Sequence, residues 1–406
     1  MQTYRCKCGN RLYFDNSICL SCQREVGWCE GCGRITALEP VTVSNRTTSG
    51  AYHCTYEDCG KTVRKCQNYV VENVCNRCYV AGEAEAAEQS GADGAAIPAN
   101  RLCNACLLTD TIPDLNVAGN RERWARLEGA KRRLLYTLDR LGLPYANATP
   151  KLTFEFKADI VPPNNEWRNA GAKEIVYTGH ADGKITINLR EADDAAREAL
   201  RVQFHEAHRT LIGHFHHEVG HYYWQLLVQN KREADCIRAF GDHNAPPYAD
   251  AMAAYYQNGP REEWPAAFIS AYASSHPWED FAETFALYLD MISVLDTASH
   301  LFKSIRANLH TRSVEPLVER FGEVGVLVNE FNRTVGLLDL VPDIVVVPVI
   351  TKLEFIHSLV KKAAKKPRVK APPTEIVVPT EVGILETVEP AIETTATPVA
   401  AKRLGA

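Results

Sequence analysis

The sequence lacks the features of a membrane, secreted or nucleic-acid-binding chain. None of its apolar runs approaches the roughly 20 residues that a bilayer-spanning helix needs, and the N-terminus, Met1 to Cys6, has no apolar core of a signal peptide. The formal net charge of −5 provides no long-range attraction to DNA or RNA. Its 406 residues have the composition of a globular chain of two or three domains. These absences predict a cytoplasmic protein with no transmembrane segment.

Cysteine is almost absent after residue 106, where only Cys236 occurs, whereas thirteen of the fourteen cysteines lie up to that point. In a reducing compartment, Cys-x-x-Cys pairs at this density indicate structural zinc rather than disulfides. A redox role is the minority interpretation, because no βαβ pattern surrounds the pairs. Cys236 is expected to be a buried thiol.

The early cysteines predict two or three structural zinc sites, each closed by four thiolates without an open position. The first set has the two-knuckle spacing of a zinc ribbon. Cys66 remains outside the sets, and the spacing does not decide whether it replaces Cys75 or Cys78 in the third one. The sets are Cys6, Cys8, Cys19 and Cys22; Cys29, Cys32, Cys54 and Cys59; and Cys75, Cys78, Cys103 and Cys106.

The composition changes along the chain and predicts its domains. Residues 1–110 form a zinc-ribbon-like cysteine-rich region, with a flexible Ala/Glu/Gly insertion at about 81–100. Residues 111–340 form the main domain, and 341–406 a C-terminal extension rich in Pro, Val and Thr that is largely disordered after about 362. Its basic run from Lys361 to Lys370 fits a solvated tail, with an acidic partner or a membrane surface as the alternative. Charges are balanced over 1–110, which argues against nucleic acid and favours a protein partner for the ribbons.

Hydrophobic periodicity predicts an α+β fold, in which small zinc-ribbon modules precede a mainly helical domain with a short mixed β-sheet. Residues 151–156 and 184–189 alternate with period two, as half-buried strands do. Gly213 is expected to divide one long helical run into two helices, and Pro277 to start another helix. The expected helical segments are 124–141, 193–230 and 278–295.

The strongest chemical signal is the motif from His217 to His221, in which Glu218 follows the first histidine. Two histidines four residues apart on a helix lie about 40° apart around its axis, so both imidazoles can bind one zinc ion. With three protein ligands, zinc leaves one position open to water, and an adjacent carboxylate can accept a proton from that water. The motif therefore predicts two ligands and a general base, Glu218. A solvated, histidine-rich helix face is the alternative.

The third ligand is expected on the helix after Pro277, which carries three carboxylates among aromatic residues. Glu279 and Glu283 are four residues apart and share a face, which suits one as a zinc ligand and the other as the residue that orients a motif histidine. Asp280 is a second candidate for the supporting role, and spacing alone does not exclude it as the ligand. A pair of solvated glutamates is the alternative.

Other histidines lie near the motif. His205 and His208 are three residues apart with no third ligand in view. His214 is one turn before His217 and could orient a ligand or pack in the core. We expect neither group to form the main metal site.

These residues resemble two families of metallopeptidases. The HExxH motif followed by Glu279 and Glu283 resembles the gluzincins, and residues 279–283 resemble the third-ligand helix of the anthrax lethal factor type. That resemblance implies Glu279 as ligand, Tyr272 as the oxyanion-stabilising tyrosine and an upstream edge strand that binds the substrate backbone, for which 184–189 is the candidate.

The chain also resembles a bacterial family of zinc-binding metallopeptidases with an N-terminal zinc ribbon. The resemblance covers residues from about 1 to 360, although the region before residue 110 has more cysteines than one ribbon needs. It implies a reaction type but no target. It is carried by Thr111–Leu115, Glu128–Leu134, Gly213–Trp224 and His276–Asp280.

The predicted function is therefore that of a zinc metallopeptidase, with one catalytic and two or three structural zinc ions and a peptide or protein as substrate. Its catalytic zinc would be held by His217, His221 and Glu279, with Glu218 as the general base and Tyr272 at the oxyanion. The alternative function is a zinc-ribbon adaptor whose peptidase-like domain binds peptides without turnover. A third hypothesis, a ribbon that binds nucleic acid, would require salt-dependent affinity.

Overall fold

The first 25 residues form two short turns that face each other, as in a zinc ribbon. The computed structural model describes residues 1–43, 46–82, 101–159, 176–203 and 210–364. Strands β1 (Tyr4–Arg5) and β2 (Arg11–Leu12) pair antiparallel, and a single bridge joins Ile18 to Glu25. Each turn carries two cysteines of the first predicted set, so the local chain reversal brings distant thiols together.

The next segment, residues 26–80, forms a closed five-stranded barrel that the sequence analysis did not predict. Each strand pairs antiparallel with the next one along the chain. The first strand also pairs parallel with the last one, and this pairing closes the barrel. Gly27 allows this closure, because a Cβ at that position would lie 2.9 Å from the Cys78 sulfur. The strands are β3 (Val26–Cys29), β4 (Arg34–Val43), β5 (Arg46–Cys54), β6 (Thr62–Lys65) and β7 (Arg77–Val80).

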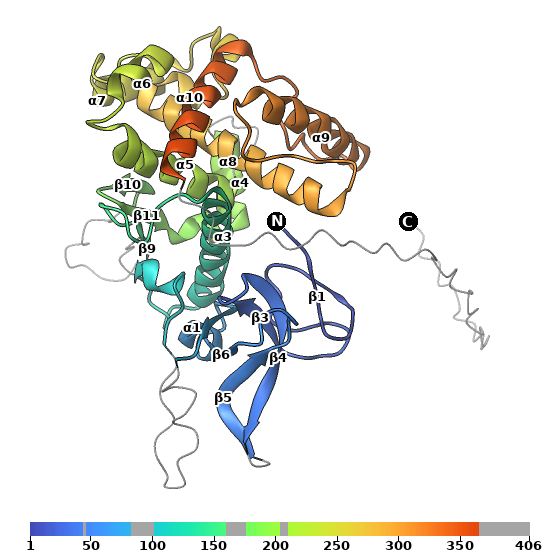
Figure 1. Cartoon of the computed structure of the whole chain (residues 1–406). Helices are drawn as coiled ribbons and strands as arrows, with labels where there is room; N and C mark the ends of the chain where they lie inside the picture. Colours follow the sequence, from blue (N-terminus) through green and yellow to red (C-terminus); the bar gives the residue numbers. More distant parts are fainter. Residues whose placement is uncertain (44–45, 83–100, 160–175, 204–209, 365–406) are drawn as a thin grey trace, which may run out of the picture. The chain divides into compact units, whose positions relative to one another are not determined.

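Helix α3 (Asn120–Leu141) connects the cysteine-rich region with the helical region (Figure 1). Its Leu127, Leu134 and Leu138 are fully buried, which explains the leucine spacing of the sequence. On another face, the ring of Tyr136 packs against Phe14 and Trp28 of the ribbon and barrel, with ring centroids 5.5 and 6.0 Å apart. Two short helices, α1 (Gln67–Val70) and η2 (Cys106–Leu108), precede it.

A four-stranded mixed sheet with the order β10-β11-β9-β8 lies beside helix α5 (Leu211–Tyr223). The predicted strands are present as β9 and β11, and they are parallel to each other. Phe154 and Phe156 of β9 are buried against Phe215 of α5, with ring centroids 5.8 and 6.3 Å apart. The strands are β8 (Thr109–Thr111), β9 (Thr153–Lys157), β10 (Gly179–Ala181) and β11 (Lys184–Asn188).

The expectation that residues 184–189 form the edge strand is wrong. Strand β11 is paired on both sides, with β9 and with β10, so its backbone is already hydrogen-bonded. Among the described strands, β10 is the edge strand on this side of the sheet, and it contacts α5. The tight turn at Asp182 and Gly183 folds β10 back onto β11. Alternation within one strand does not reveal which neighbours that strand has.

The prediction that Gly213 separates two helices is also wrong. Helix α4 (Asp194–Gln203) ends earlier, and α5 (Leu211–Tyr223) contains Gly213 in its first turn. The Thr210 side chain accepts a hydrogen bond from the Gly213 amide, so this segment is a capped helix start. His205 and His208 lie outside the described residues.

Helices α5 and α8 (Pro277–Leu301) pack directly against each other (Figure 1). Gly220 makes this close crossing possible, because a Cβ there would lie 2.9 Å from the Cα of Ala282. Helix α8 begins where the sequence predicts, since Pro277 occupies its first turn and the His276 side chain accepts a hydrogen bond from the Trp278 amide. This crossing brings the two halves of the predicted site together.

Helix α10 (Val347–Ala363) lies beyond residue 340, where the sequence analysis placed the start of the extension. It packs against α6 and α8 and buries Leu353, Ile356 and Val360. The insertion at 83–100 and the tail after residue 364 lie outside the described residues. The remaining elements are η3 (Leu189–Ala192), the π-helix η4 (Trp224–Val228), α6 (Glu233–Phe240), α7 (Tyr248–Asn258), η5 (Trp264–Ala266), η6 (Tyr272–Ser274) and α9 (Glu315–Thr334).

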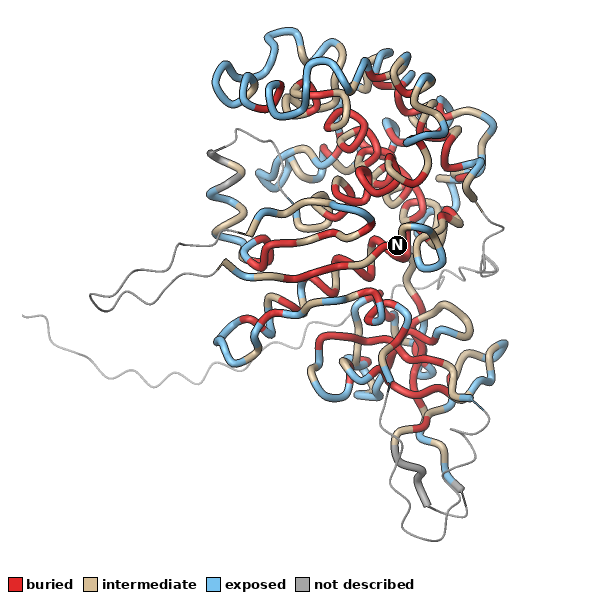
Figure 2. The backbone as a smooth tube through the Cα atoms, turned by 90° about the vertical axis from the view of Figure 1, so that its left-hand side faces the viewer, coloured by how far each residue is buried: buried red, intermediate tan, exposed pale blue. Residues whose placement is uncertain are grey.

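The predicted α+β fold class is confirmed. Long buried stretches run through the packed helices and the sheet, while exposed residues lie in connecting segments and on outer helices such as α7 (Figure 2). The main hydrophobic core extends from the cysteine-rich region through α3 to the helices, and a smaller one lies under the first turns. No helix among the described residues is long and apolar enough to cross a membrane.

Candidate metal centres

Helix α5 presents His217 and His221 on one face, toward α8. Their Nε2 atoms are 3.1 Å apart, and the Glu279 Oε2 atom of α8 lies 3.1 and 3.4 Å from them. A tetrahedral zinc ion with bonds of about 2.0–2.1 Å separates its ligand atoms by about 3.3 Å. The three predicted ligand atoms therefore stand at the spacing that one zinc ion requires.

The carboxylate of Glu279 supports this assignment because it is buried beside the two histidines. Glu279 is only 2% exposed, and its Oε2 atom faces the Nε2 atoms of His217 and His221. A buried carboxylate is costly unless a cation or hydrogen-bond donors compensate its charge. Zinc at this position would compensate the buried charge.

Glu283, one turn further along α8, contacts the opposite side of His217. Its Oε1 atom lies 2.6 Å from His217 Nδ1, and its Oε2 atom accepts a hydrogen bond of 2.7 Å from Ser270. A carboxylate on the distal nitrogen of a metal-binding histidine selects the tautomer whose other nitrogen faces the metal. The structure therefore places Glu283 in the orienting position, while Ser270 is a support that the sequence analysis missed.

Glu218 lies between the two histidines in sequence and is 8% exposed. Its Oε2 atom is buried without a hydrogen-bond partner among the described residues. Burial raises the pKa of Glu218, and the neighbouring histidines oppose this effect. A carboxylate of this kind can accept a proton more readily than one in water, as a general base must.

The expectation that Asp280 supports the metal ligands is not met by its position. Asp280 is fully buried, and its Oδ2 atom lies 2.7 Å from the Lys352 ammonium of α10. The Thr284 hydroxyl donates to its other oxygen over 3.3 Å. One residue turns a helix by about 100°, so the carboxylate after Glu279 faces a different helix.

Tyr272 and Tyr248 approach the site from two different elements. The Tyr272 ring of η6 lies 5.9 Å from the His217 ring. Tyr248, the first residue of α7, donates a hydrogen bond of 2.7 Å to Glu279 Oε1. The sequence analysis missed Tyr248, because no local spacing relates it to Glu279 and only tertiary structure brings them together.

The nearby histidines have separate contacts. His214 Nδ1 lies 3.4 Å from Glu191, and His216 Nδ1 lies 2.8 Å from Asp290. Neither belongs to the metal-binding group of His217, His221 and Glu279. His214 thus lies against an acidic side chain.

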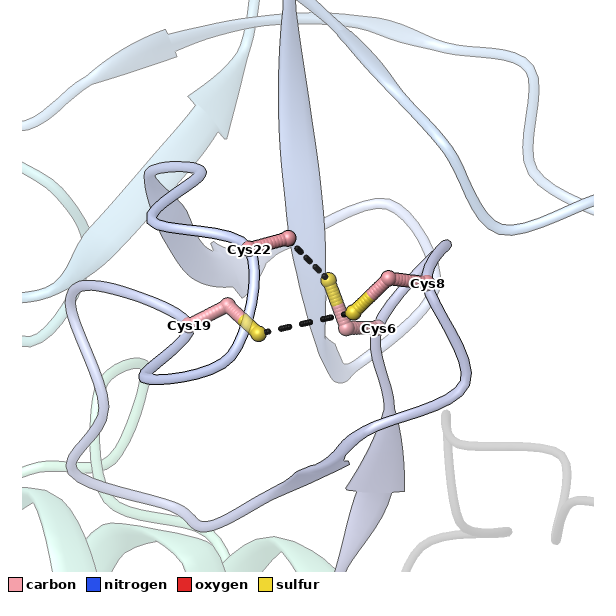
Figure 3. Close-up of side chains that lie close together, drawn as sticks. All are labelled: Cys6, Cys8, Cys19 and Cys22. Carbon is pink, nitrogen blue, oxygen red and sulfur yellow. Dashed lines mark hydrogen bonds between the residues drawn. The ribbon is translucent and has the colours of Figure 1, made fainter.

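The first two cysteine sets come together as the sequence grouped them. In the first, the Cys6 and Cys22 sulfurs and the Cys8 and Cys19 sulfurs are each 3.7 Å apart (Figure 3). In the second, the Cys29 and Cys59 sulfurs are 3.7 Å apart, and the Cys32 and Cys54 sulfurs are 3.8 Å apart. Zinc–sulfur bonds of about 2.3 Å in a tetrahedron separate the sulfurs by about 3.8 Å, so both groups fit a zinc ion.

The third group differs from the first choice of the sequence analysis, because Cys66 takes the place of Cys78. The grouped thiols are Cys66, Cys75, Cys103 and Cys106, all buried. Cys78 belongs to β7, and its sulfur lies against Gly27 of the barrel. Cys66 follows β6, and its sulfur accepts a hydrogen bond from the Cys103 amide over 3.3 Å. Barrel closure therefore decides between the two.

Cys236 is 3% exposed and lies outside these groups. Burial raises the pKa of its thiol to about 12, which keeps it protonated at neutral pH. This is the buried thiol that the sequence predicted.

Known protein families match both the cysteine-rich region and the helical region. The family described as "Putative zinc-binding metallo-peptidase" matches residues 120–359, and a zinc-ribbon domain family matches residues 3–117. Uncharacterized proteins of Mycobacterium bovis and of two Mycobacterium tuberculosis strains are 34% identical over 376 residues, which cover 90% of this chain and 96% of theirs. No solved structure matches the chain.

Proposed function

The chain belongs to the zinc-binding metallo-peptidase family, and from this premise we propose that it is an active peptidase with Glu218 as general base. One observation carries the proposal: three ligand atoms from His217, His221 and Glu279 stand at tetrahedral spacing, next to a buried carboxylate with an unpaired oxygen. Zinc-binding proteins with purely structural sites have four protein ligands and need no such base. Three ligands and a base suit hydrolysis.

Zinc bound there supplies a Lewis acid, which polarises a carbonyl group and lowers the pKa of water. Glu218 accepts the proton of the attacking water and then delivers it to the leaving nitrogen, which its buried position favours. The Tyr272 ring lies 5.9 Å from the His217 ring, and its hydroxyl donates a hydrogen bond to the oxyanion. Glu283 holds the His217 ring by its Nδ1 atom.

The substrate backbone is proposed to pair with β10. This strand has a free edge among the described strands and lies against α5, which carries the histidines. An extended peptide can add to such an edge through main-chain hydrogen bonds, so that its carbonyl groups pass the site at regular intervals. The substrate class is therefore a peptide or an extended segment of a protein.

The three cysteine groups are proposed to hold one structural zinc ion each. Four thiolates close a tetrahedral site and leave no position for a reactant. Their role is to stabilise small turns and a barrel with little apolar core of their own. The complete chain would then bind four zinc ions, of which only one is catalytic.

The test compares wild type with Glu218→Gln and His217→Ala. Glu218→Gln should keep all the zinc and lower the cleavage rate of a mixed peptide pool by about 10²–10⁴-fold, measured by mass spectrometry. His217→Ala should lose both cleavage and one chelator-exchangeable zinc ion. Equal cleavage by wild type and Glu218→Gln would refute the mechanism. A wild-type protein that holds the exchangeable zinc but cleaves nothing would favour the adaptor.

A further inference from the structure

Tyr248 stands at the beginning of α7, beside the residues that flank Glu279. Its ring packs edge-on against His276 and Trp278, with centroids 5.1 and 5.6 Å apart. Trp278 in turn packs against the ring of His221, at 4.4 Å between centroids. Tyr248 is thus part of the aromatic surroundings of the ligands, although it belongs to another helix.

The Tyr248 hydroxyl engages the oxygen of Glu279 that does not face the histidines. It donates to Oε1 over 2.7 Å, whereas Oε2 lies 3.1 Å from His217 Nε2. The terminal torsion of a glutamate is broad, so packing alone does not define the direction of its two oxygens. A donor on Oε1 fixes that rotation and leaves Oε2 for the metal.

Helix α7 also contacts Tyr272. The ring of Tyr255, two turns after Tyr248, lies 5.9 Å from the Tyr272 ring between centroids. The Tyr272 ring in turn lies 5.9 Å from the His217 ring. Helix α7 therefore contacts both the third ligand and the tyrosine at the proposed oxyanion position.

We propose that Tyr248 is a positioning residue, which sets the carboxylate of Glu279 for zinc binding. This inference rests on the proposed function only for its effect on hydrolysis, because its effect on zinc binding is independent of turnover. Tyr248 acts through Glu279 and touches no reacting atom. Hydrogen-bonding partners behind metal ligands contribute about 10–100-fold to affinity or activity.

The experiment uses the full chain with Tyr248→Phe, which keeps the ring and removes the donor. Tyr256→Phe is the matched control, since Tyr256 lies on the same helix and is 63% exposed. Zinc affinity of the histidine site is measured by competition with a chromophoric chelator, while the cysteine-bound zinc is counted separately. We expect Tyr248→Phe to weaken the affinity by about 10-fold or more. Unchanged affinity, or an equal loss in Tyr256→Phe, would overturn the inference.

A second measurement separates the role of Tyr248 from a general disturbance of the fold. In a Glu279→Ala background the hydroxyl has no carboxylate to position, so adding Tyr248→Phe should change the zinc affinity by less than about twofold. A loss as large as in the wild-type background would show that the effect does not pass through Glu279. Both results are obtained even from a protein that cleaves no peptide, so they are distinct from a failure of the proposed function.

Where peptide cleavage is observed, the ratio of kinetic constants adds a further check. At saturating zinc, loss of the Tyr248 hydroxyl should lower kcat through the less well oriented Glu279 carboxylate and leave KM within about twofold, because β10 still binds the substrate backbone. A rise in KM with unchanged kcat would instead mean that Tyr248 contacts the substrate, which contradicts a positioning role.

Discussion

The cysteine groups and the histidine site differ in their ligands and in what surrounds them. The third cysteine group has four thiols, each at most 4% exposed, and the fold covers all of them. The histidine site has three ligands, and next to them lies a carboxylate with an unpaired oxygen. A closed set of ligands can only hold the fold together, whereas an incomplete one leaves room for a reactant. The number of protein ligands thus separates the structural from the proposed catalytic role.

The largest expected effect concerns the third cysteine group. Cys66→Ala should remove one zinc ion per chain and unfold the cysteine-rich region, because structural zinc contributes on the order of 10 kcal/mol to small domains. Zinc content and limited proteolysis of residues 3–117 measure this loss. Cys78→Ala is the matched control, since that thiol is equally buried but lies outside the group. Zinc loss in Cys78→Ala but not in Cys66→Ala would show that Cys78 belongs to the third group, as the sequence first predicted.

The next prediction tests whether the buried ion pair of Asp280 and Lys352 only stabilises the fold. Lys352→Met leaves the fully buried Asp280 without its cation, which should lower the free energy of unfolding by about 3–5 kcal/mol. Urea denaturation measures the change. Replacing both residues, with Asp280→Leu, should recover part of the stability. The zinc affinity of the folded variant should stay within about twofold of the wild-type value. A larger change would mean that Asp280 supports the metal ligands.

A smaller effect is expected at the histidine site itself. Glu283→Gln replaces the charged acceptor on His217 Nδ1 and should weaken zinc binding there by about 10–100-fold, with the cysteine-bound zinc unchanged. Chelator competition measures both pools. The control is Asp290→Asn, because Asp290 pairs with His216 across the same two helices but outside the site. Equal weakening in both variants would mean that helix packing, not ligand orientation, is disturbed.

The last effect is a pH dependence of stability that arises on the edge strand β10. Burial lowers the pKa of His180 to about 4 from an ordinary 6.5, so the folded state keeps it neutral while the unfolded state takes up a proton. The stability is therefore complete above pH 6.5 and falls as the pH decreases toward 4, with a slope below about 1.4 kcal/mol per pH unit. His180→Gln should flatten this slope in urea titrations. An identical slope in both proteins would contradict the assignment, and the exposed His310→Gln should leave it unchanged.

Local spacing was informative wherever the ligands share one element. The step from His217 to His221 and the step from Glu279 to Glu283 follow from the helical repeat, so the sequence predicted both pairs of side chains. The knuckle spacing likewise grouped the first two cysteine sets as the structure has them. In each case the paired residues lie within a few positions of one another, although Cys29 and Cys59 of the second set are 30 residues apart.

Spacing failed where a choice depends on distant segments. Cys66 lies nine residues before Cys75 and Cys78 three residues after it, and only closure of the barrel turns Cys78 toward Gly27. β11 has the alternation of a half-buried strand, but the turn that places β10 outside it determines which strand has the free edge. Tyr248 reaches Glu279 from a separate helix, and no periodic pattern connects them.

The sequence by itself determined the type of chemistry in this protein: cysteine pairs for structural zinc, and two histidines with a glutamate on one helix. These are properties of neighbouring residues, because an α-helix or a knuckle has a fixed local geometry. The tertiary structure alone decided how these elements meet, through the close crossing at Gly220, the different partners of Glu279 and Asp280, and the contact with Tyr248. Such contacts depend on packing between segments far apart in the chain, which local sequence patterns do not encode.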